Sequence, residues 1–367
     1  MLKVLILSRD PSWYGGVVNF VELLKNNFTP EVNVESFTIG RRHKSGLFGR
    51  LSTPIYDAFR LYKRVHGSSY EVIHLNPSLN VASLLRDGLF MVVLRCCSCK
   101  KVFVTWHGWE LRLAERLQHW PWKMFFRGVF GFSESMWLLS SSFSRQLCAM
   151  GISRSKIQQF TTMFDGSIFH GHRRNRLDDE IRLLFLSRFE KEKGVYELLE
   201  AFNSVLQKEN NVRLYLAGDG PEMRCMRAWV KTHKLDEKVI FTGYLREGDK
   251  VQALIDADMF VFPTYYGEGC PVSLLEAMAA GLPIITAPAG GIPDIFKDGT
   301  NGFLLQNVTS AAIASAVMKL LHDSALREKF GEHNRNEAWE KYEAKIVTRK
   351  FEEFYLELAG NKRECQA

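Results

Sequence analysis

Residues 262–281 read FPTYYGEGCPVSLLEAMAAG, and this stretch decides the fold class. A β-rich run ends at Pro263, a glycine-containing loop carries Glu268, and a helix begins near Pro271 or Val272. A buried strand that is followed by a short loop and a helix is half of a parallel βαβ unit. The stretch therefore predicts an α/β sheet whose strand ends present polar loops.

The two carboxylates of this stretch are well placed to bind a sugar nucleotide. Glu268 lies in the loop, and Glu276 lies close to the helix start. Carboxylates accept hydrogen bonds from vicinal hydroxyls, and the amides of a helix start attract phosphate. One carboxylate can therefore hold a ribose and the other a sugar ring. Complementation of the helix dipole explains Glu276 without a ligand, but it does not explain Glu268, Gly267 and Gly269 together.

The same alternation extends through the chain, whose 367 residues exceed the roughly 250–300 at which one core stops growing. It predicts two Rossmann-like, doubly wound α/β domains that face each other across a cleft. We expect the first domain over residues 1–172, the second over 173–345, and a helix over 346–367 that is available to pack back on the first. The β-type runs occupy residues 3–7, 72–75, 101–105, 182–187, 212–217, 239–242 and 259–262.

Charge is distributed unevenly along the sequence. Residues 1–180 contain 24 Lys and Arg against 14 Asp and Glu, a net of +10, whereas residues 181–367 contain 24 against 27, a net of −3. The excess in the first half favours an anionic partner there, such as a lipid surface or a phosphate-bearing acceptor. Solubility alone explains it equally well.

Neither a membrane span nor a metal site is expected. The apolar runs fall far short of the roughly 20 residues that cross a bilayer. The seven cysteines are an odd number and form no framework of disulfide pairs, which fits reduced thiols in the cytoplasm. Cys96 and Cys99 form a C-x-x-C that no second pair completes. Asp256 and Asp258 resemble a D-x-D metal motif, but their place before a buried run indicates a structural role.

Two further loops carry groups suited to phosphate. Gly15 and Gly16 separate the first strand from its helix, where unpaired amides attract anions, although a plain turn explains a double glycine equally well. Arg188 and Lys193 follow the first strand of the second half, at the sheet edge where open α/β folds bind ligands. The two cations suit a diphosphate, and a solvated charged loop is the alternative.

Together these stretches resemble the retaining glycosyltransferases of the GT-B fold, especially glycosyltransferase family four (glycosyl transferases group 1). The spacing of Glu268 and Glu276 is similar to the E-x7-E motif of that family. The resemblance covers most of the chain, and its other matches occur in the family's order: Gly15-Gly16, Thr105-Trp106-His107-Gly108, Phe164-Asp165-Gly166 with Phe169, Ser187-Arg188, Lys193-Gly194, and residues 218–222, 241–245 and 289–293.

The resemblance implies a role for each matching residue. His107 and Glu268 would be the catalytic residues, because both would contact the transferred sugar. Glu276 would bind the ribose hydroxyls, and Arg188 and Lys193 would neutralise the leaving diphosphate. The remaining donor-binding positions would approach the phosphates or the base: Gly15, Gly16, Tyr244, Leu245, Gly269, Cys270, Pro271, Val272 and Ser273. A lone histidine at a strand end is more often structural, so the role of His107 comes from the resemblance.

Two patches in the first half are candidates for contact with an acceptor or a membrane. Interleaved aromatic and basic residues on one helix suit an anionic membrane surface. An aromatic core stripe beside a solvated loop is the alternative, and no nucleic-acid-binding motif accompanies either patch, so we expect no nucleic acid partner. The patches comprise Trp109, Arg112, Arg116, Trp120, Trp122, Lys123, Phe125, Phe126 and Arg127, and the loop residues Arg41, Arg42, Lys44 and Arg50.

The sequence therefore predicts a retaining glycosyltransferase that needs neither a metal nor another cofactor. It would move a hexose-type sugar from a UDP- or GDP-sugar to a glycan or lipid-linked acceptor in polysaccharide or glycoconjugate biosynthesis. It would act in the cytoplasm or peripherally at the inner face of the membrane. The alternatives are a nucleotide-sugar 2-epimerase of the same fold, which would release no free nucleotide, and a non-catalytic subunit that binds a nucleotide-sugar.

Overall fold

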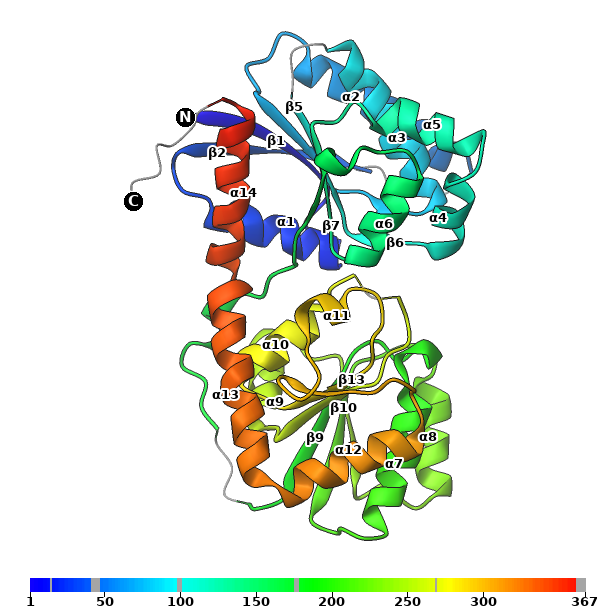
Figure 1. Cartoon of the computed structure of the whole chain (residues 1–367), viewed down its shortest axis with the longest axis vertical. Coiled ribbons are helices and arrows are strands. Elements are labelled where there is room, and N and C mark those ends of the chain that lie inside the picture. The colour runs from blue at the N-terminus through cyan, green and yellow to red at the C-terminus, as the bar shows by residue number, and fades with distance from the viewer. Residues whose placement is uncertain (14, 41–46, 98–100, 175–177, 268, 361–367) are drawn as a thin grey trace. The chain divides into compact units, whose positions relative to one another are not determined.

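The computed structural model describes residues 1–13, 15–40, 47–97, 101–174, 178–267 and 269–360. Its chain divides into two compact units, of which the first contains residues 1–162 and 344–367 and the second contains residues 163–343. Each unit is an open parallel sheet with helices on both of its faces (Figure 1). The predicted fold class is therefore confirmed within each unit.

The first unit is built on a parallel sheet in the strand order β2-β1-β3-β5-β7-β8. Every residue of β3 and β7 is buried, because helices cover both faces of the sheet. The strands are β1 (Leu2–Arg9), β2 (Val32–Ile39), β3 (Val72–Leu75), β5 (Lys101–Trp106), β7 (Ser135–Leu138) and β8 (Ile157–Gln159). A separate parallel pair is formed by β4 (Ser78–Leu79) and β6 (Gly108–Trp109).

Some helices of the first unit begin at a side-chain cap and others do not. The side chain of Asn80 accepts a hydrogen bond from the Ser83 N–H at 2.9 Å and so caps α3. Gly15 stands at the N-cap of α1 without a side-chain cap. The helices are α1 (Gly16–Asn27), α2 (Leu47–Val65), α3 (Val81–Cys96), α4 (Leu111–Leu117), α5 (Trp122–Phe130) and α6 (Ser141–Ala149).

The second unit repeats the plan with the strand order β11-β10-β9-β12-β13-β14, all parallel. The strands are β9 (Ile181–Leu186), β10 (Val212–Ala217), β11 (Val239–Gly243), β12 (Met259–Phe262), β13 (Ile284–Thr286) and β14 (Gly302–Leu304). The helices are α7 (Val195–Leu206), α8 (Met223–Thr232), α9 (Glu247–Asp256), α10 (Val272–Ala280), α11 (Ile292–Ile295), α12 (Ser310–His322) and α13 (Ser324–Lys341), with short 3-10 turns η2 (Gly166–Phe169) and η3 (Lys191–Lys193).

The last helix, α14 (Ala344–Leu358), belongs to the first unit. It packs beside α1, where the rings of Phe351 and Phe20 are 5.7 Å apart. The Tyr355 hydroxyl and Nδ1 of His74 are hydrogen-bonded at 2.6 Å, and both side chains are fully buried. The first unit therefore takes part of its core from the end of the chain.

The division between the units differs from the expected boundary after residue 172, because it falls between residues 162 and 163. Packing explains the difference. The Phe164 N–H donates to the Tyr342 carbonyl oxygen at 3.1 Å, and the Phe164 ring lies 5.4 Å from that of Trp339. The chain therefore enters the second unit before the polar stretch over residues 170–180, and this stretch is not the linker between the units.

Several predicted elements coincide with observed ones. The expected strands at 72–75, 212–217 and 259–262 are β3, β10 and β12. The helix expected over residues 346–367 is α14, which begins at Ala344 and ends at Leu358. Within the described ranges, no helix has both the length and the apolar composition needed to cross a bilayer.

Candidate functional site

Both sheets have a point at which the strand order reverses. In the first sheet it lies between β1 and β3, and in the second between β9 and β12. Open α/β sheets bind ligands at the carboxyl ends of the strands beside such a point, because the loops diverge there and leave room. Residues that bind a ligand are therefore expected in the loops that follow β1, β3, β9 and β12.

The two predicted cations of the second unit follow β9. Arg188 is exposed, with its Nη1 atom 3.0 Å from the Glu190 carboxylate, whereas Lys193 is only 5% exposed. The Nζ atom of Lys193 lies 4.4 Å from the centre of the Tyr266 ring, in the loop after β12. That loop is tied to the turn η3, since the Tyr266 N–H donates to the Glu192 carbonyl oxygen at 3.2 Å. The structure thus joins Lys193 to the loop between β12 and α10, the helix that contains Glu276.

Glycines permit this close approach of loops. Gly194 has a φ of 73°, and a Cβ atom there would lie 2.3 Å from the Pro263 carbonyl oxygen. A Cβ atom at Gly218 would lie 1.9 Å from the Ser187 carbonyl oxygen, and one at Gly220 would lie 2.5 Å from that of Phe189. These glycines therefore pack the loops after β9, β10 and β12 against one another.

Glu276 points from α10 toward α9 and is only 4% exposed. Its carboxylate forms an ion pair with Lys250, a residue that the sequence did not single out. Burial raises the pKa of Glu276, the Lys250 ammonium opposes that rise, and the charge of Asp165 adds to it. The Phe164-Asp165-Gly166 motif is therefore brought into electrostatic range of Glu276.

The start of α10 has no side-chain cap. Pro271 is the N-cap residue, and the first turn contains no acidic residue, so Glu276 does not complement the helix dipole from that turn. Within the described part of the chain, the N–H groups of Val272 and Ser273 have no acceptor. Cys270 is buried, Gly269 is half-buried, and Glu268 lies outside the described residues. A helix start with unsatisfied amides is suited to a phosphate.

Tyr244 and Leu245 lie at the same edge of the second sheet. They follow β11, which is separated from β9 by β10. Tyr244 is 65% exposed, and Leu245 is half-buried. Their position at a distance of one strand from the cations suits a longer ligand that extends along the sheet edge.

In the first unit, His107 follows β5. Its Nε2 atom lies 2.9 Å from Oδ1 of Asn76, and its ring packs edge-on against Phe20 with centres 4.7 Å apart. Burial lowers the pKa of His107 to about 3, so the imidazole is neutral at physiological pH. Asn76, which comes directly after β3, was not predicted as a site residue.

Gly15 and Gly16 lie at the start of α1, beside the end of β1. A Cβ atom at either glycine would meet no atom within 4 Å. Protein packing alone therefore does not require glycine at these two positions, and the backbone remains accessible to a ligand.

The aromatic and basic patch is divided between core and surface. Trp109 stacks on Phe143 with ring centres 5.0 Å apart, and Phe126 is fully buried. Trp120, Trp122 and Phe125 are exposed by 80%, 49% and 46%. The prediction of a single helix was wrong, because the patch spans β6, α4 and α5. Arg41, Arg42 and Lys44 lie outside the described residues, and only the backbone is described at Arg50.

The Asp256-Ala257-Asp258 stretch links α9 to β12, as expected. Oδ2 of Asp258 accepts a hydrogen bond from the Arg182 N–H at 2.8 Å, so this carboxylate holds the start of β9. Among the residues that the structure describes, no three His, Cys, Asp or Glu side chains gather in a way that would hold a metal ion.

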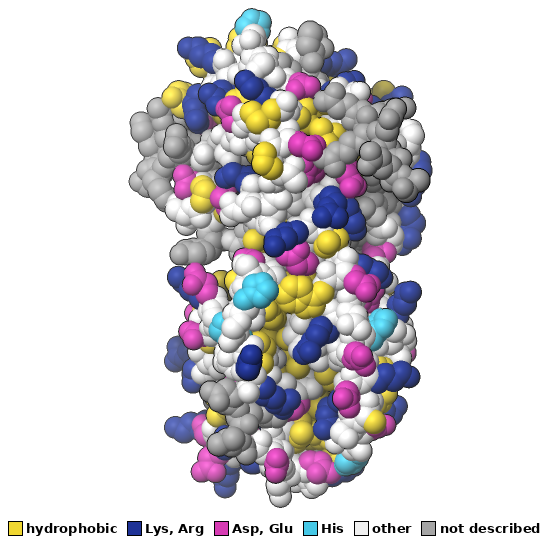
Figure 2. All heavy atoms as spheres, turned by 90° about the vertical axis from the view of Figure 1, so that its left-hand side faces the viewer, with side chains coloured by type: hydrophobic (Ala, Val, Ile, Leu, Met, Phe, Trp, Pro, Cys, Tyr) yellow, Lys and Arg dark blue, Asp and Glu magenta, His cyan; other side chains and the backbone are white. Residues whose placement is uncertain are grey.

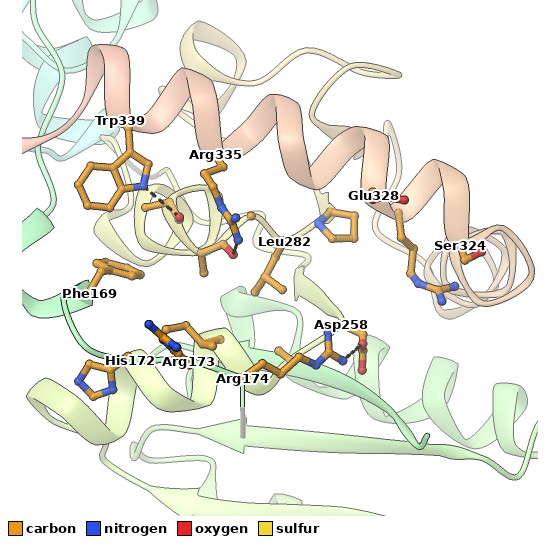
Figure 3. A pocket seen from close by; sticks show the side chains of 17 residues that line it. Phe169, His172, Arg173, Arg174, Asp258, Leu282, Ser324, Glu328, Arg335 and Trp339 are labelled. Atoms are coloured by element: carbon orange, nitrogen blue, oxygen red, sulfur yellow. Dashed lines mark hydrogen bonds and ion pairs between the residues drawn. The ribbon is translucent and has the colours of Figure 1, made fainter. Parts of the chain in front are cut away.

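A cavity of about 770 Å³ lies beside α13 in the second unit (Figure 3). Hydrophobic side chains are exposed between basic ones on this face (Figure 2). The cavity is at the amino ends of β12 and β13, away from the loops described above. Its arginines have structural partners: Arg335 donates to the Ala280 carbonyl oxygen at 2.9 Å, and Arg174 pairs with Asp258. We therefore do not assign the predicted site to this cavity.

Two Rossmann-like units with these loops at their carboxyl edges define the GT-B class of fold. Residues 170–337 match the family described as Glycosyl transferases group 1, and this part of the chain belongs to that family.

Individual relatives agree with this assignment. The N-acetyl-alpha-D-glucosaminyl L-malate synthase of Bacillus anthracis is 29% identical over 181 residues, which are 49% of this chain and 46% of that protein. The amylovoran biosynthesis glycosyltransferase AmsK of Erwinia amylovora is 24% identical over 297 residues, or 80% and 70% of the two chains. The match to the first of these relatives thus spans less than half of its length.

A solved structure supports the fold over nearly the whole chain. Anabaena HepE in complex with UDP-glucose superimposes with a TM-score of 0.74 at 15% identity, covering 96% of this chain and 99% of its own. At that identity the likeness establishes the fold alone.

Proposed function

We propose that the chain is a retaining glycosyltransferase that takes a hexose-type sugar from a UDP- or GDP-sugar without a metal ion. The observation that carries the proposal is the buried carboxylate of Glu276, which is paired with Lys250, beside the uncapped start of α10. A buried carboxylate there accepts hydrogen bonds from ribose hydroxyls, and the N–H groups at the helix start donate hydrogen bonds to a phosphate. The family match over residues 170–337 supports the same proposal.

In the proposed reaction, the bond between the anomeric carbon and the diphosphate oxygen breaks, and a bond to the acceptor hydroxyl forms on the same face. The acceptor proton passes to a departing phosphate oxygen. Arg188 and Lys193 stabilise the charge that develops on the diphosphate, which replaces the Lewis acid of a metal-dependent transferase. The neutral imidazole of His107 is the group of the first unit that the proposal assigns to the transferred sugar.

The test is release of nucleoside diphosphate from a panel of UDP- and GDP-sugars, with and without a chelator. Glu276→Ala should raise the KM for the donor about 10- to 100-fold, since it removes hydrogen bonds to a charged acceptor worth roughly 1.5–3 kcal/mol. Glu332→Gln, an exposed change on α13, is the matched control and should leave the rates unchanged. The anomeric configuration of the product, followed by NMR, tests retention.

Three outcomes would contradict the proposal: full activity of Glu276→Ala, loss of activity with the chelator, or an inverted product. A nucleotide-sugar 2-epimerase would convert the donor without accumulating free nucleotide. A non-catalytic subunit would bind the donor and release nothing.

We propose in addition that the exposed aromatic residues of α5 and of the turn before it contact an anionic membrane surface. Trp120, Trp122 and Phe125 are exposed beside Lys123 and Arg127. Exposed aromatic rings favour the interface of a bilayer, and neighbouring cations attract anionic head groups. Such contact would bring the first unit to a lipid-linked acceptor.

A further inference from the structure

The first unit contains a pocket of about 200 Å³ at the point where its strand order reverses. Arg9 lies at the end of β1, Asn76 follows β3, and Arg86 comes from α3; all three line the pocket together with Gly16 and Ser78. Asn76 also holds His107. The pocket therefore adjoins the histidine that is proposed to contact the transferred sugar.

Arg86 is fixed in the wall of this pocket. Its Nε and Nη2 atoms donate to the two carboxylate oxygens of Asp87 at 2.9 and 2.6 Å, and Nη2 also donates to the Ser83 hydroxyl at 3.0 Å. Asp87 is only 2% exposed. The guanidinium is thus held rigidly from one side, which leaves its Nη1 group without a partner among the described residues.

The charges around the pocket do not balance. The described residues that line the pocket include two cations, Arg9 and Arg86, and no carboxylate, while Asp87 pairs with Arg86 from behind the lining. Arg9 is exposed, with its guanidinium carbon 5.6 Å from the centre of the Trp13 ring. The remaining polar lining consists of hydroxyl and amide groups, so one positive charge is left for a ligand.

We propose that this pocket binds a phosphate or carboxylate group of the acceptor, and that Arg9 and Arg86 select charged acceptors over neutral ones. The inference rests on the proposed transfer function. A guanidinium group donates charge-assisted hydrogen bonds to either kind of anion, and Arg86 has its Nη1 group for this purpose. Ligand sites usually measure about 300–1,000 Å³, so this pocket holds the anionic group and leaves the rest of the acceptor outside.

The full chain labelled with 5-fluorotryptophan tests the proposal, because Trp13 lines the pocket. Its ¹⁹F resonance, assigned with Trp13→Phe, is followed during titration with glycerol 1-phosphate, glycerate and glycerol at constant ionic strength. We expect saturable movement with one or both anions and none with glycerol. Which anion binds names the group on the acceptor. Arg9→Gln and Arg86→Gln should each weaken binding at least 10-fold.

The result that would overturn the proposal is no movement with either anion, or equal binding by wild type and both variants. Because Arg86 is partly buried, Arg9→Gln, an exposed change, keeps the test valid if Arg86→Gln does not fold. Displacement of the anion by a nucleotide-sugar would assign the pocket to the donor and would also contradict the proposal. Anion binding by a protein that releases no nucleotide from any donor would refute the proposed function and leave the anion site intact.

Discussion

Glu276 and Lys250 form an ion pair. Burial favours the neutral form of Glu276 and raises its pKa, whereas the charge of Lys250 favours the ionised form. In the proposed function the ionised carboxylate accepts hydrogen bonds from both hydroxyls of a ribose. Under that proposal Lys250 is a positioning residue, because its ammonium group favours the ionised form of Glu276.

The first prediction concerns the pH dependence of this pair. The pKa of Glu276 in the folded chain is raised above the ordinary value, so ionised Glu276 costs stability as pH rises through that pKa. In Lys250→Met the pKa should rise further, because the opposing charge is lost. We expect a loss of about 3 kcal/mol at pH 8 and a smaller loss at pH 5, measured as the difference in Tm from wild type. A loss independent of pH would contradict this account.

The second prediction concerns Gly194. An alanine there would need a positive φ and would meet the Pro263 carbonyl oxygen, so we expect a loss of about 1 kcal/mol or more and a weaker affinity for the donor. Gly128→Ala in α5, where a Cβ atom meets nothing within 4 Å, should be neutral or slightly stabilising. Thermal unfolding of both variants, with nucleotide binding by calorimetry, provides the comparison.

At the residue scale, the sequence pointed to some candidate site residues but not to the residues that pair with them. Arg188 and Lys193 come between the end of β9 and Gly194, and Glu276 lies in the helix that follows the loop of Glu268, so local patterns in the sequence mark all three. Lys250 and Asn76 carry no local signal, because their partners are Glu276 and His107, which only the folding of the chain brings near. Long-range pairs of this kind depend on helix packing and strand order, which spacing alone does not define.

At the level of elements, strands that are buried on both faces were the most predictable. β12 consists of four buried apolar residues, and its limits were predicted correctly. The aromatic patch was harder to interpret, because burial of Phe126 and exposure of Phe125 depend on which side of α5 faces α3. The sequence alone does not show whether an aromatic residue of this helix is buried or exposed.

The third prediction concerns the exposed side of α5. Trp122→Ala combined with Phe125→Ala should weaken binding to vesicles that contain phosphatidylglycerol at least 10-fold, since each large side chain contributes roughly 1.5–3 kcal/mol when buried. Lys123→Gln should lower binding at low salt, whereas Lys329→Gln, an exposed change on α13, should not. Cosedimentation measures both. Equal binding of all variants would exclude α5 as the contact.

For the whole molecule, the position of α14 is important because it makes the end of the chain part of the first unit. Phe351 and Tyr355 are fully buried against residues from the first 162, so the first unit is incomplete without them. Our fourth prediction is that a chain of residues 1–162 will be insoluble or unfolded. The same residues joined by a flexible linker to 344–360 should fold, as judged by a cooperative thermal transition. A cooperative transition in the shorter chain would contradict the prediction.

Because a segment near residue 350 fills a gap beside the first strands, synthesis and folding cannot proceed in the same order. While the ribosome is still translating the second unit, the hydrophobic surface that α14 will cover is open to solvent and to chaperones. The second unit, whose residues are consecutive, has all of its own segments available first, and the amino-terminal half reaches its final state only after almost the entire chain has emerged.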